Sequence, residues 1–517
     1  MQKKKLRILI IDLIHNSTSR SLYRWIMFPN YISIMPQIIG VWCKEEGHEV
    51  RYAIFTGSQD LKYQLGEKTD LVFISSFTFT AQLAYALSNY FRSKGIVTVL
   101  GGSHARCYPE DSCNYFDYVM GLTDKELLKD LLHSFEMNKT GGIYLTATSQ
   151  PDSIPGVRER WDFIEQIHRR FNFIRVIPMI GSFGCPYHCD FCIDAEIPYQ
   201  TLDMEMIIED LKFISNKVKH PVVSWYDPNF AIKFNPIVET IESVVPPGNF
   251  DFVAECSLSV LSETHVKRLQ KIGLKMVMPG IESWFNYGDK LKMRSKVGMH
   301  RVKEVSEQVN MINSYIPHVQ TNFVFGFDTD SGEEPFTLTK RFIDLAPGAY
   351  PSYALLSIFG KGARDIQKYE IDDRIIPFPF HMLMSVHMTN IIPKNYSWEQ
   401  LFNQYIDLLK YSFSTKAIIR RFNASKMQKS KWLTLLLSLT IGGRGKIKYL
   451  ESFLHRLKVD PAFRSFVRKE TNTIPGFLIE KVKKDLGALW PWCPVESLSY
   501  ITKVSSEQTV RANEIVG

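Results

Sequence analysis

Residues 181–192 read GSFGCPYHCDFC, which places three cysteines, Cys185, Cys189 and Cys192, within eight positions. The spacing is C-x3-C-x2-C, and it directly follows the apolar run IRVIPMI at residues 174–180. A short apolar run of this kind indicates a buried strand, so the cysteines are expected on the loop that leaves its C-terminal end. Thiolates gathered on one loop bind zinc or iron. The sequence therefore predicts a metal-binding loop at this point.

An iron–sulfur cluster explains three cysteines better than zinc does. Structural zinc sites usually have four ligands in paired knuckles, and residues 160–225 contain no second C-x2-C. Three thiolates leave one iron of a [4Fe–4S] cluster open, and an open iron can bind a further ligand. The alternative is three unrelated buried thiols, as the other cysteines are expected to be. Those are spread singly along the chain, at positions 43, 107, 113, 256 and 493.

The chain around the cysteines alternates between strand and helix patterns. Helix patterns occur, for instance, at residues 203–217 and 261–272. About six strand–helix units predict a partial (β/α)6 barrel of the TIM type, with its chemistry at the C-terminal ends of the strands. The candidate strands are IRVIPMIGSF, PVVSWYD, FDFVAEC, LKMVMPGI, VQTNFVFGF and PSYALLSIFG.

The N-terminal region shows a similar alternation. Helix patterns at residues 35–46 and 81–95 lie between continuous apolar runs, which indicates a parallel, doubly wound sheet buried on both faces. Ligands of such sheets bind outside the C-terminal ends of the strands, where Ser75, Gly101 and Gly102 are expected. The candidate strands are LRILIIDLI, HEVRYAIF, TDLVFISSFT, IVTVLGG and FDYVMG.

The predicted fold class is α/β. We expect a Rossmann-like domain at residues 1–140, a linker at 141–170, the barrel at 171–365 and a mostly helical domain at 366–517. The longest late apolar run, residues 432–441, is shorter than the ~20 residues that a membrane-spanning helix needs. We therefore expect a cytoplasmic protein whose cysteines are reduced and available as ligands.

With Phe191 directly before the third cysteine, the loop resembles the C-x3-C-x-aromatic-C motif of the radical S-adenosylmethionine superfamily. The resemblance implies that Cys185, Cys189 and Cys192 bind three irons of a [4Fe–4S] cluster, and that S-adenosylmethionine chelates the fourth. One electron, from a reductant such as flavodoxin or ferredoxin, would then yield a 5′-deoxyadenosyl radical. That radical takes a hydrogen atom from the substrate, while the protein supplies positioning and excludes water.

Three further segments resemble motifs of this superfamily and follow the cysteines in the expected order. The segment GIES contains Glu282 and Ser283 and resembles the motif near the ribose and methionine portions of the cofactor. NFVFGFD contains Gly326 and resembles the strand that lets the adenine approach. YDPNF resembles a D-x-N-F strand end, and its Asp227 is expected near the amine group because the usual GGE segment is absent.

The doubly wound domain in front of the barrel resembles the cobalamin-binding branch of the superfamily. The resemblance implies contacts to cobalamin from Ser75 and from Gly101, Gly102 and His104 in the segment GGSH. The D-x-H-x-x-G motif, which supplies a histidine to cobalt in the classical cobalamin fold, is not matched. His15 stands at a different spacing and is not predicted as a ligand.

These resemblances predict an enzyme that methylates an unactivated carbon of a biosynthetic substrate. Two alternatives stay open from the sequence. One is radical cyclisation, oxidation or rearrangement without methyl transfer, on the same cofactors. The other is a non-enzymatic iron–sulfur protein, or one that keeps the cobalamin-type fold without the cofactor.

The basic residues are unevenly distributed. The net charge of the chain is +8, and residues 401–460 hold 12 Lys or Arg against three Asp or Glu. One interpretation is an amphipathic surface at an anionic membrane, peripheral at the inner membrane face, with a lipid substrate rather than another small molecule. The alternative is a packed helical domain with a solvated basic face. No nucleic-acid recognition module is visible, so nucleic acid is not expected.

Overall fold

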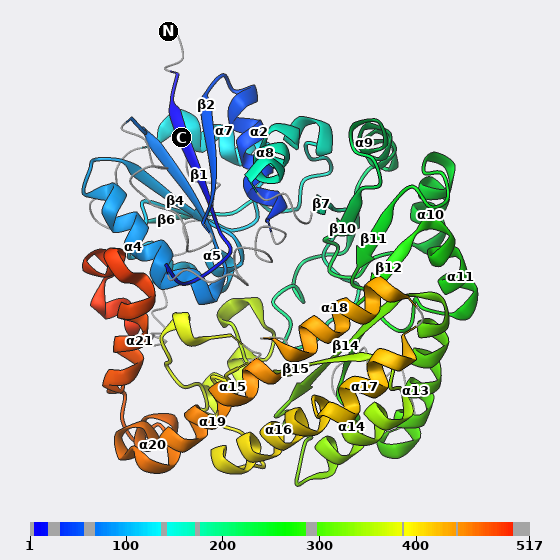
Figure 1. Cartoon of the computed structure of the whole chain (residues 1–517). Coiled ribbons are helices and arrows are strands. Elements are labelled where there is room, and N and C mark those ends of the chain that lie inside the picture. Colours follow the sequence, from blue (N-terminus) through cyan, green and yellow to red (C-terminus); the bar gives the residue numbers. More distant parts are fainter. Residues whose placement is uncertain are drawn as a thin grey trace.

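The structure is a computed structural model of the chain. It describes residues 5–18, 32–55, 68–135, 142–170, 176–285, 297–384, 387–425, 427–440 and 443–499. Figure 1 shows an N-terminal sheet domain in blue and cyan, an arc of parallel strands in green, and C-terminal helices from yellow to red. The predicted α/β class is confirmed.

The N-terminal sheet has six parallel strands in the order β2-β1-β3-β4-β5-β6. Six of the seven residues of β1 are buried, because helices cover both faces of the sheet. Helix α4 packs on one face, and helices α2, α7 and α8 pack on the other. The strands are β1 (Arg7–Leu13), β2 (Glu49–Phe55), β3 (Leu71–Ser76), β4 (Val97–Gly101), β5 (Tyr118–Met120) and β6 (Ile143–Leu145); the helices are α2 (Ile34–Glu45), α4 (Ala81–Arg92), α7 (Lys125–Ser134) and α8 (Val157–Arg170).

Strand β6 lies inside the stretch predicted as a linker, residues 141–170. It pairs in parallel with β5, and the rest of that stretch leads through α8 into the second sheet. The strand has three residues, none of them buried, so its apolar stretch is too short to be recognised as a strand from the sequence. The N-terminal sheet therefore extends past residue 140, while the domain limits themselves stay predictions.

The second sheet is an arc of parallel strands with helices on its outside. Strand β14 pairs with β12, β13 and β15, and the order continues from β12 through β11 and β10 to β7. No pairing among the described residues joins β7 to β15, so the barrel is a partial one. Its strands are β7 (Val176–Met179), β10 (Val222–Trp225), β11 (Asp251–Ala254), β12 (Leu274–Val277), β13 (Gly280–Glu282), β14 (His318–Phe325) and β15 (Tyr350–Leu355), and its helices are α9 (Met204–Lys217), α10 (Phe234–Val244), α11 (Glu263–Ile272), α13 (Gly298–Tyr315) and α14 (Glu334–Leu345).

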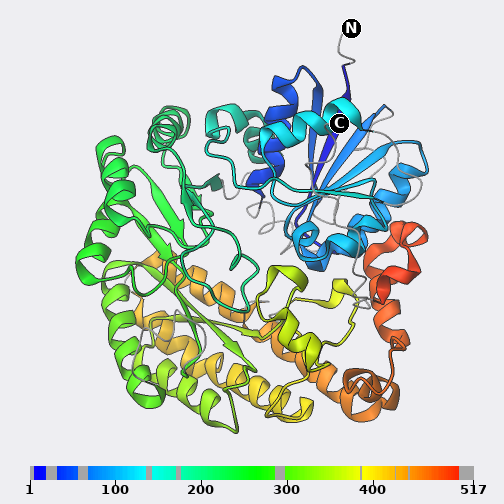
Figure 2. The ribbon, with the colours of Figure 1, turned by 180° about the vertical axis from the view of Figure 1, so that it is seen from behind.

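The C-terminal region is helical, as predicted, and it returns to the N-terminal domain. Gln82 and Asn89 of α4 donate hydrogen bonds to the carbonyls of Ser497 (2.9 Å) and Trp492 (3.1 Å). Seen from behind, the segment that follows β15 lies between the two sheets (Figure 2). The helices are α16 (Trp398–Ser412), α17 (Thr415–Ala424), α18 (Gln428–Leu439), α19 (Arg444–Val459), α20 (Pro461–Val467) and α21 (Gly476–Leu486).

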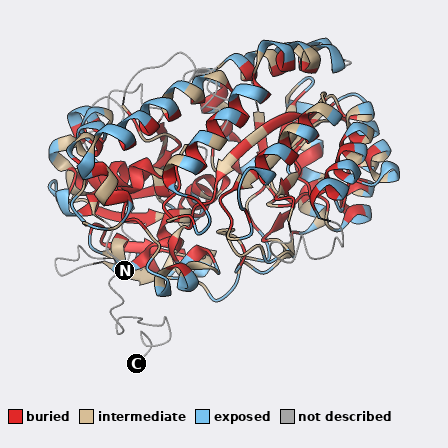
Figure 3. Ribbon diagram, turned by 90° about the horizontal axis from the view of Figure 1, so that it is seen from below, coloured by how far each residue is buried: buried red, intermediate tan, exposed pale blue. Residues whose placement is uncertain are grey.

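One cluster of buried apolar side chains extends from the N-terminal sheet through the barrel to the C-terminal helices. The buried positions run through the interior of all three regions, and the exposed ones line the outer faces of the helices (Figure 3). The two sheets are therefore held in a fixed relation. Within the described part of the chain, none of the helices has both the length and the apolar character to cross a membrane.

Candidate active site at the ends of two parallel sheets

The cysteine loop leaves the C-terminal end of β7, as the sequence predicts. A two-stranded antiparallel ribbon, β8 (Ser182–Phe183) with β9 (Gln200–Thr201), closes the base of the loop. Gly184 has a φ of +63°, and a Cβ there would lie 2.4 Å from the carbonyl oxygens of Ile197 and Pro198. Only glycine fits this turn, so the loop starts in a fixed direction just before the first cysteine.

The three cysteines form no disulfide bond within the described residues, and each is of intermediate exposure. The amide of Cys192 donates to the carbonyl of Cys189 (2.9 Å), and the amide of Asp194 donates to Cys192 Sγ (3.5 Å). The pKa of Cys192 is raised to about 11, mainly by burial and with smaller contributions from the charges of Asp194, Cys185 and Glu282. Metal binding displaces such a thiol proton, so a metal held here would be bound by the thiolate.

No group of three or more His, Cys, Asp or Glu side chains among the described residues is close enough to hold a single metal ion. Ligands of one zinc ion must converge on a common centre at about 2.0–2.3 Å. In a [4Fe–4S] cluster each cysteine binds a different iron, so the sulfur atoms stand farther apart.

Asp227 holds the base of the cysteine loop. Its carboxylate accepts hydrogen bonds from the amide of Gly181 (3.0 Å), just before β8, and from Oγ of Ser182 (2.5 Å), the first residue of β8. The side chain is 4% exposed, and burial raises its pKa to about 6. Both carboxylate oxygens therefore accept hydrogen bonds from the protein, which gives Asp227 a positioning role at the base of the loop. The predicted contact to the cofactor's amine group gains no support from this geometry and stays a prediction.

A hydrogen-bonded network that the sequence analysis did not single out supports the first cysteine. Asn229 Nδ2 lies 3.8 Å from Cys185 Sγ and also donates to Ser257 Oγ (3.2 Å), while its Oδ1 accepts from the amide of Ser257 (2.8 Å). Ser257 Oγ contacts Ser259 Oγ (2.8 Å), which contacts the hydroxyl of Tyr187 (2.7 Å). Asn229 belongs to the segment YDPNF, which the sequence alone singles out, whereas Ser257 and Ser259 belong to no recognised motif.

Phe191 packs at the end of β14, where the sequence places the adenine. Its ring centroid lies 5.5 Å from that of Phe327. The preceding Gly326 has a φ of +96°, and the nearest atom to a Cβ built there is 3.6 Å away on Leu401. Asp330 accepts hydrogen bonds from the amides of Gly326 (2.9 Å) and Phe327 (3.2 Å), which fixes this turn. Gly326 is therefore required by its backbone conformation, and the space beside it is free of protein backbone.

Glu282 is the last residue of β13, which pairs with β14, and Ser283 follows it. Glu282 has a φ of +64°, a conformation that a non-glycine residue adopts only when its surroundings impose it. It is half-buried, and its charge acts on Cys192, so it lies near the cysteine loop. Ser283 is buried and accepts a hydrogen bond from the amide of Phe285 (3.2 Å), so its hydroxyl serves the local turn.

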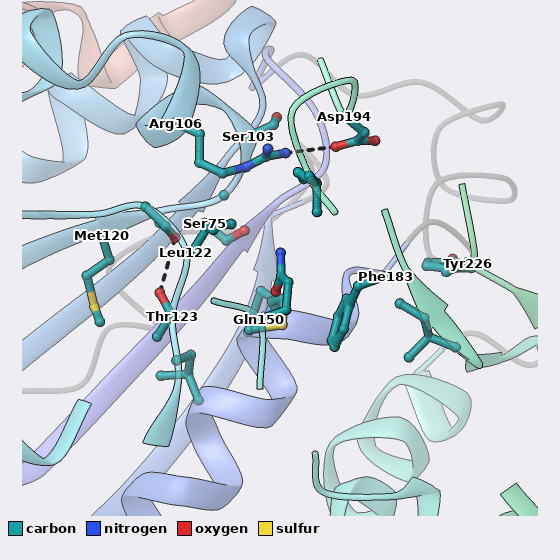
Figure 4. Close-up of a pocket in the computed structure, with 18 of the residues that line it drawn as sticks. Ser75, Ser103, Arg106, Met120, Leu122, Thr123, Gln150, Phe183, Asp194 and Tyr226 are labelled. Carbon is teal, nitrogen blue, oxygen red and sulfur yellow. Dashed lines mark hydrogen bonds and ion pairs between the residues drawn. The ribbon is translucent and has the colours of Figure 1, made fainter. Parts of the chain in front are cut away.

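A cavity of about 260 Å³ lies between the two sheets. Ser75, Gly101 and Gly102 line it from the N-terminal sheet, and Phe183 and Tyr226 line it from the barrel side. In Figure 4, Ser75 lies on one side of the cavity, and Phe183 and Tyr226 lie on the other. The strand ends of both sheets therefore meet at one site, as expected for ligands bound at the C-terminal edges of parallel strands.

The floor of the cavity is made by small residues of the N-terminal sheet. A Cβ built on Gly101 meets no atom within 4 Å, so this residue borders open space. Gly102 has a φ of +92°, and a Cβ there would lie 2.7 Å from the carbonyl oxygen of Ser76. The Ser75 hydroxyl has no hydrogen-bond partner among the described residues, so it is available to a ligand.

Arg106 and Asp194 join the two sides of the cavity. Arg106 lies on helix α5 (Ser103–Cys107) of the N-terminal domain, and Asp194 follows the third cysteine by two positions. Their side chains form an ion pair with an N–O distance of 2.9 Å, drawn as a dashed line in Figure 4. This pair ties the cysteine loop to the N-terminal domain and was not predicted from the sequence.

His104 does not line the cavity, in contrast to the prediction. It is fully buried on α5, where its Nε2 lies 2.6 Å from the hydroxyl of Tyr85 and its ring packs against Phe380. Burial lowers its pKa to about 3. The glycine turn at Gly101 and Gly102 is where the sequence predicts it. Helix α5 then begins at Ser103, and the side chain of His104 points into the core. The described residues that line the cavity include no histidine, and His15 instead accepts from the amide of Ser17 (3.0 Å).

Residues 179–338 match the model of the Radical SAM superfamily, so this part of the chain is a radical SAM domain. A domain of this kind uses a [4Fe–4S] cluster and S-adenosylmethionine, which confirms these two predicted cofactors and the prediction of an enzyme. The particular residues that bind them stay predictions.

Two curated relatives come from Chlorobaculum tepidum. Bacteriochlorophyllide d C-12(1)-methyltransferase is 22% identical over 364 residues, which is 69% of this chain and 78% of the relative. Bacteriochlorophyllide d C-8(2)-methyltransferase is 23% identical over 419 residues, which is 78% of this chain and 90% of the relative.

The fold is similar to those of two solved enzymes. The methyltransferase TsrM from Kitasatospora setae, with tryptophan and a cofactor analogue bound, gives a TM-score of 0.56 at 12% identity, over 87% of this chain and 99% of that one. The cobalamin-dependent S-adenosylmethionine radical enzyme OxsB gives a TM-score of 0.57 at 12% identity, over 95% of this chain and 84% of that one. The predicted combination of sheet domain, barrel and helical domain is confirmed as this fold.

Proposed function

We propose that the chain is a cobalamin-dependent radical S-adenosylmethionine enzyme that methylates an unactivated carbon of a small-molecule substrate. One observation carries the proposal: Gly184 and Asp194, which lie on either side of the three cysteines, line the same cavity as the open strand ends of the N-terminal sheet. A radical generator and a methyl carrier must both reach one carbon atom, and this arrangement gives them a common space. The names of the two curated relatives as methyltransferases support the same reaction class.

On the barrel side, Cys185, Cys189 and Cys192 would hold the cluster. Asp227 and Asn229 would keep the loop in place, since both are buried and hydrogen-bonded to it or beside it. When bound and reduced, the cluster and S-adenosylmethionine supply a 5′-deoxyadenosyl radical, and cobalamin supplies a transferable methyl group.

S-Adenosylmethionine would lie between the cysteine loop and the ends of β13 and β14. Glu282 is half-buried near Cys192, which suits hydrogen bonding to the ribose or the methionine portion. Gly326 leaves room for the adenine, and Phe191 packs beside that turn. Ser283 is the weaker candidate of the motif because its hydroxyl already accepts a backbone hydrogen bond.

On the other side, Ser75, Gly101 and Gly102 fit the cobalamin prediction, and His104 does not. Gly101 borders open space and Ser75 offers a hydroxyl without a partner among the described residues, as a bulky polar ligand requires. His104 is engaged in the core by Tyr85 and is left out of the proposal. Because no histidine occurs among the described lining residues, the proposed cobalamin has no histidine ligand from this cavity.

The partners beyond the cofactors belong to the same proposal. Reduction of the cluster requires a one-electron donor such as flavodoxin or ferredoxin. The substrate is expected to be a small molecule or a lipid, in an enzyme that works in the cytoplasm and can lie at the inner face of the membrane.

The test follows the methyl group of S-adenosylmethionine. The full chain is loaded anaerobically with cluster and cobalamin, and it is supplied with reductant and cofactor that carries a deuterated methyl group. The proposal predicts 5′-deoxyadenosine and, with a tetrapyrrole such as those on which the curated relatives act, or another accepted substrate, a product that carries the label. Deoxyadenosine with an unlabelled product would indicate cyclisation, oxidation or rearrangement instead. A bound cluster without deoxyadenosine would indicate a non-enzymatic iron–sulfur protein.

A further inference from the structure

Helix α18 packs on the barrel with its polar side inward. Ser430, Thr434 and Ser438 stand four residues apart and are all buried. Ser430 donates to the carbonyl of Pro317 (2.6 Å), and Thr434 Oγ1 lies 3.3 Å from Nδ1 of His318, the first residue of β14. The helix therefore covers the N-terminal end of a barrel strand with hydroxyl groups.

The opposite side of α18 is apolar and exposed. Trp432, Leu436 and Leu439 recur at helical spacing, and their exposed fractions are 63%, 51% and 49%. Ile419 of the neighbouring α17 is 54% exposed, and Met427, between the two helices, is 41% exposed. A surface helix normally buries its apolar side. Here the burial is reversed, so the outer side has the character of a surface that needs an apolar partner.

The charges around this apolar face have one sign. Between Asp407 and Glu451 the sequence contains ten Lys or Arg and no Asp or Glu. Arg420 is paired with Asp344 at 2.8 Å. Lys416 and Lys431, next to the apolar face, have no ion-pair partner within the residues that the structure describes.

We propose that the α17–α18 face, formed by Ile419, Met427, Trp432, Leu436 and Leu439 with Lys416 and Lys431, docks on an anionic lipid bilayer. Apolar side chains with an interfacial tryptophan would enter the boundary of the acyl chains, while the lysines meet the anionic headgroups. The same face of a second copy is a poorer partner, because residues 408–450 contain no Asp or Glu that could neutralise the lysines of an identical face.

The position of this face also decides what the contact can do. It covers the N-terminal end of β14, whereas the cavity lies at the C-terminal ends of the strands. In Figure 1, α17 and α18 lie across the barrel, away from the N-terminal sheet domain. The contact is therefore an anchor for the enzyme and not the entrance to its active site. It does not rest on the proposed reaction.

The test is flotation of the full chain, loaded with its cluster, with vesicles of phosphatidylcholine alone or mixed with phosphatidylglycerol. The chain is expected to float with the anionic vesicles, less so as salt rises, and not with the neutral ones. Each lysine close to an anionic surface contributes about fivefold to partitioning, so Lys416→Glu with Lys431→Glu should lower it by at least about 25-fold. Leu436→Glu should abolish flotation.

The matched control is Ile371→Glu, which places the same charge on α15 (Ile366–Ile371), at a side chain that is 84% exposed and away from this face. It should float like the unaltered chain, and all variants should keep their iron content and far-UV circular dichroism. Absence of flotation of the unaltered chain at low salt would overturn the proposal. So would flotation of Leu436→Glu at the unaltered level, or a dimer in solution that Leu436→Glu dissociates while neither form binds vesicles.

Discussion

The two parallel sheets end at the same cavity, but their edges are built in opposite ways. At the edge of the N-terminal sheet the residues are small, and Gly101 borders open space. At the edge of the barrel, Asp227 and Asn229 are buried and hydrogen-bonded to the cysteine loop or to its neighbours. The first edge provides room, and the second provides fixed positions.

The difference follows from what each edge is proposed to bind. A large cofactor that brings its own chemistry needs mainly space and a few polar contacts. Three thiols on a loop must instead be held in one arrangement before a cluster can join them, which takes supporting hydrogen bonds around the ligands. Substitutions at the two edges should therefore have separable effects, on iron at one edge and on cobalt at the other.

The largest effect is expected on the barrel side. Cys185→Ala removes one of three cluster ligands and should abolish both iron retention and deoxyadenosine formation, because an incomplete ligand set no longer holds the cluster. Iron analysis and product chromatography after anaerobic reconstitution measure the two effects. The control is Cys256→Ala, a buried thiol at the end of β11, which should keep about four irons per chain. Full iron content in Cys185→Ala would contradict the assigned ligands.

The matching change on the other edge is Gly101→Leu. Its side chain would fill open space in the cavity, so cobalt retention should be lost while iron content stays unchanged. Gly476→Leu is the matched control, because a Cβ on that residue also meets nothing within 4 Å and it lies on α21. The measurement is the cobalt and iron content of the purified chains. Equal cobalt content in both variants would show that cobalamin does not bind in this cavity.

A smaller effect is expected from the titration of Asp227. Burial raises its pKa from 3.8 to about 6, so the folded chain binds this proton more tightly than the unfolded chain does. Its contribution to stability is complete below about pH 4 and is lost as the pH rises through 6, by about 3 kcal/mol. Relative to Asp227→Asn, the unaltered cluster-free chain should lose this amount of unfolding free energy between those pH values. Urea unfolding at several pH values measures this loss. The same dependence of unfolding free energy on pH in both chains would contradict the raised pKa of Asp227.

The smallest effect is expected where the edges are joined. Arg106 and Asp194 are partly exposed, with side-chain exposures of 21% and 27%, so their ion pair should contribute no more than about 1 kcal/mol. A double-mutant cycle with Arg106→Gln and Asp194→Asn, read by urea unfolding, isolates that coupling. A coupling of several kcal/mol would mean that this pair is a main fastening between the two sides and not a minor one.

The strands and the cysteine loop could be predicted because their signals are local. Apolar runs such as those of β1 and β3 are typical of buried strands, and three cysteines within eight positions are typical of a metal-binding loop. The networks around the site could not be predicted in the same way. Asn229 reaches Ser257, and Arg106 reaches Asp194, across 28 and 88 positions of the sequence, and only folding brings them together.

Three residues show why a motif alone does not give a role. Asp227 stands where a cofactor contact is expected, yet its two oxygens are used by the loop base. His104 follows a glycine turn at the cavity but points into the core toward Tyr85. Trp432 belongs to an apolar run that suggests a buried helix, but it lies on the exposed side because hydroxyl groups face the barrel. In each case the contacts of the residue, and not its type, determine its role.

The central claim is that both cofactors are held at one cavity by opposite edges. Metal analysis and absorbance spectra of the full chain, purified anaerobically with cobalamin supplied, test it most directly. The account predicts about four irons and about one cobalt per chain, with cobalt lost and iron kept in Gly101→Leu. Iron without cobalt in the unaltered chain, or full cobalt in Gly101→Leu, would contradict it.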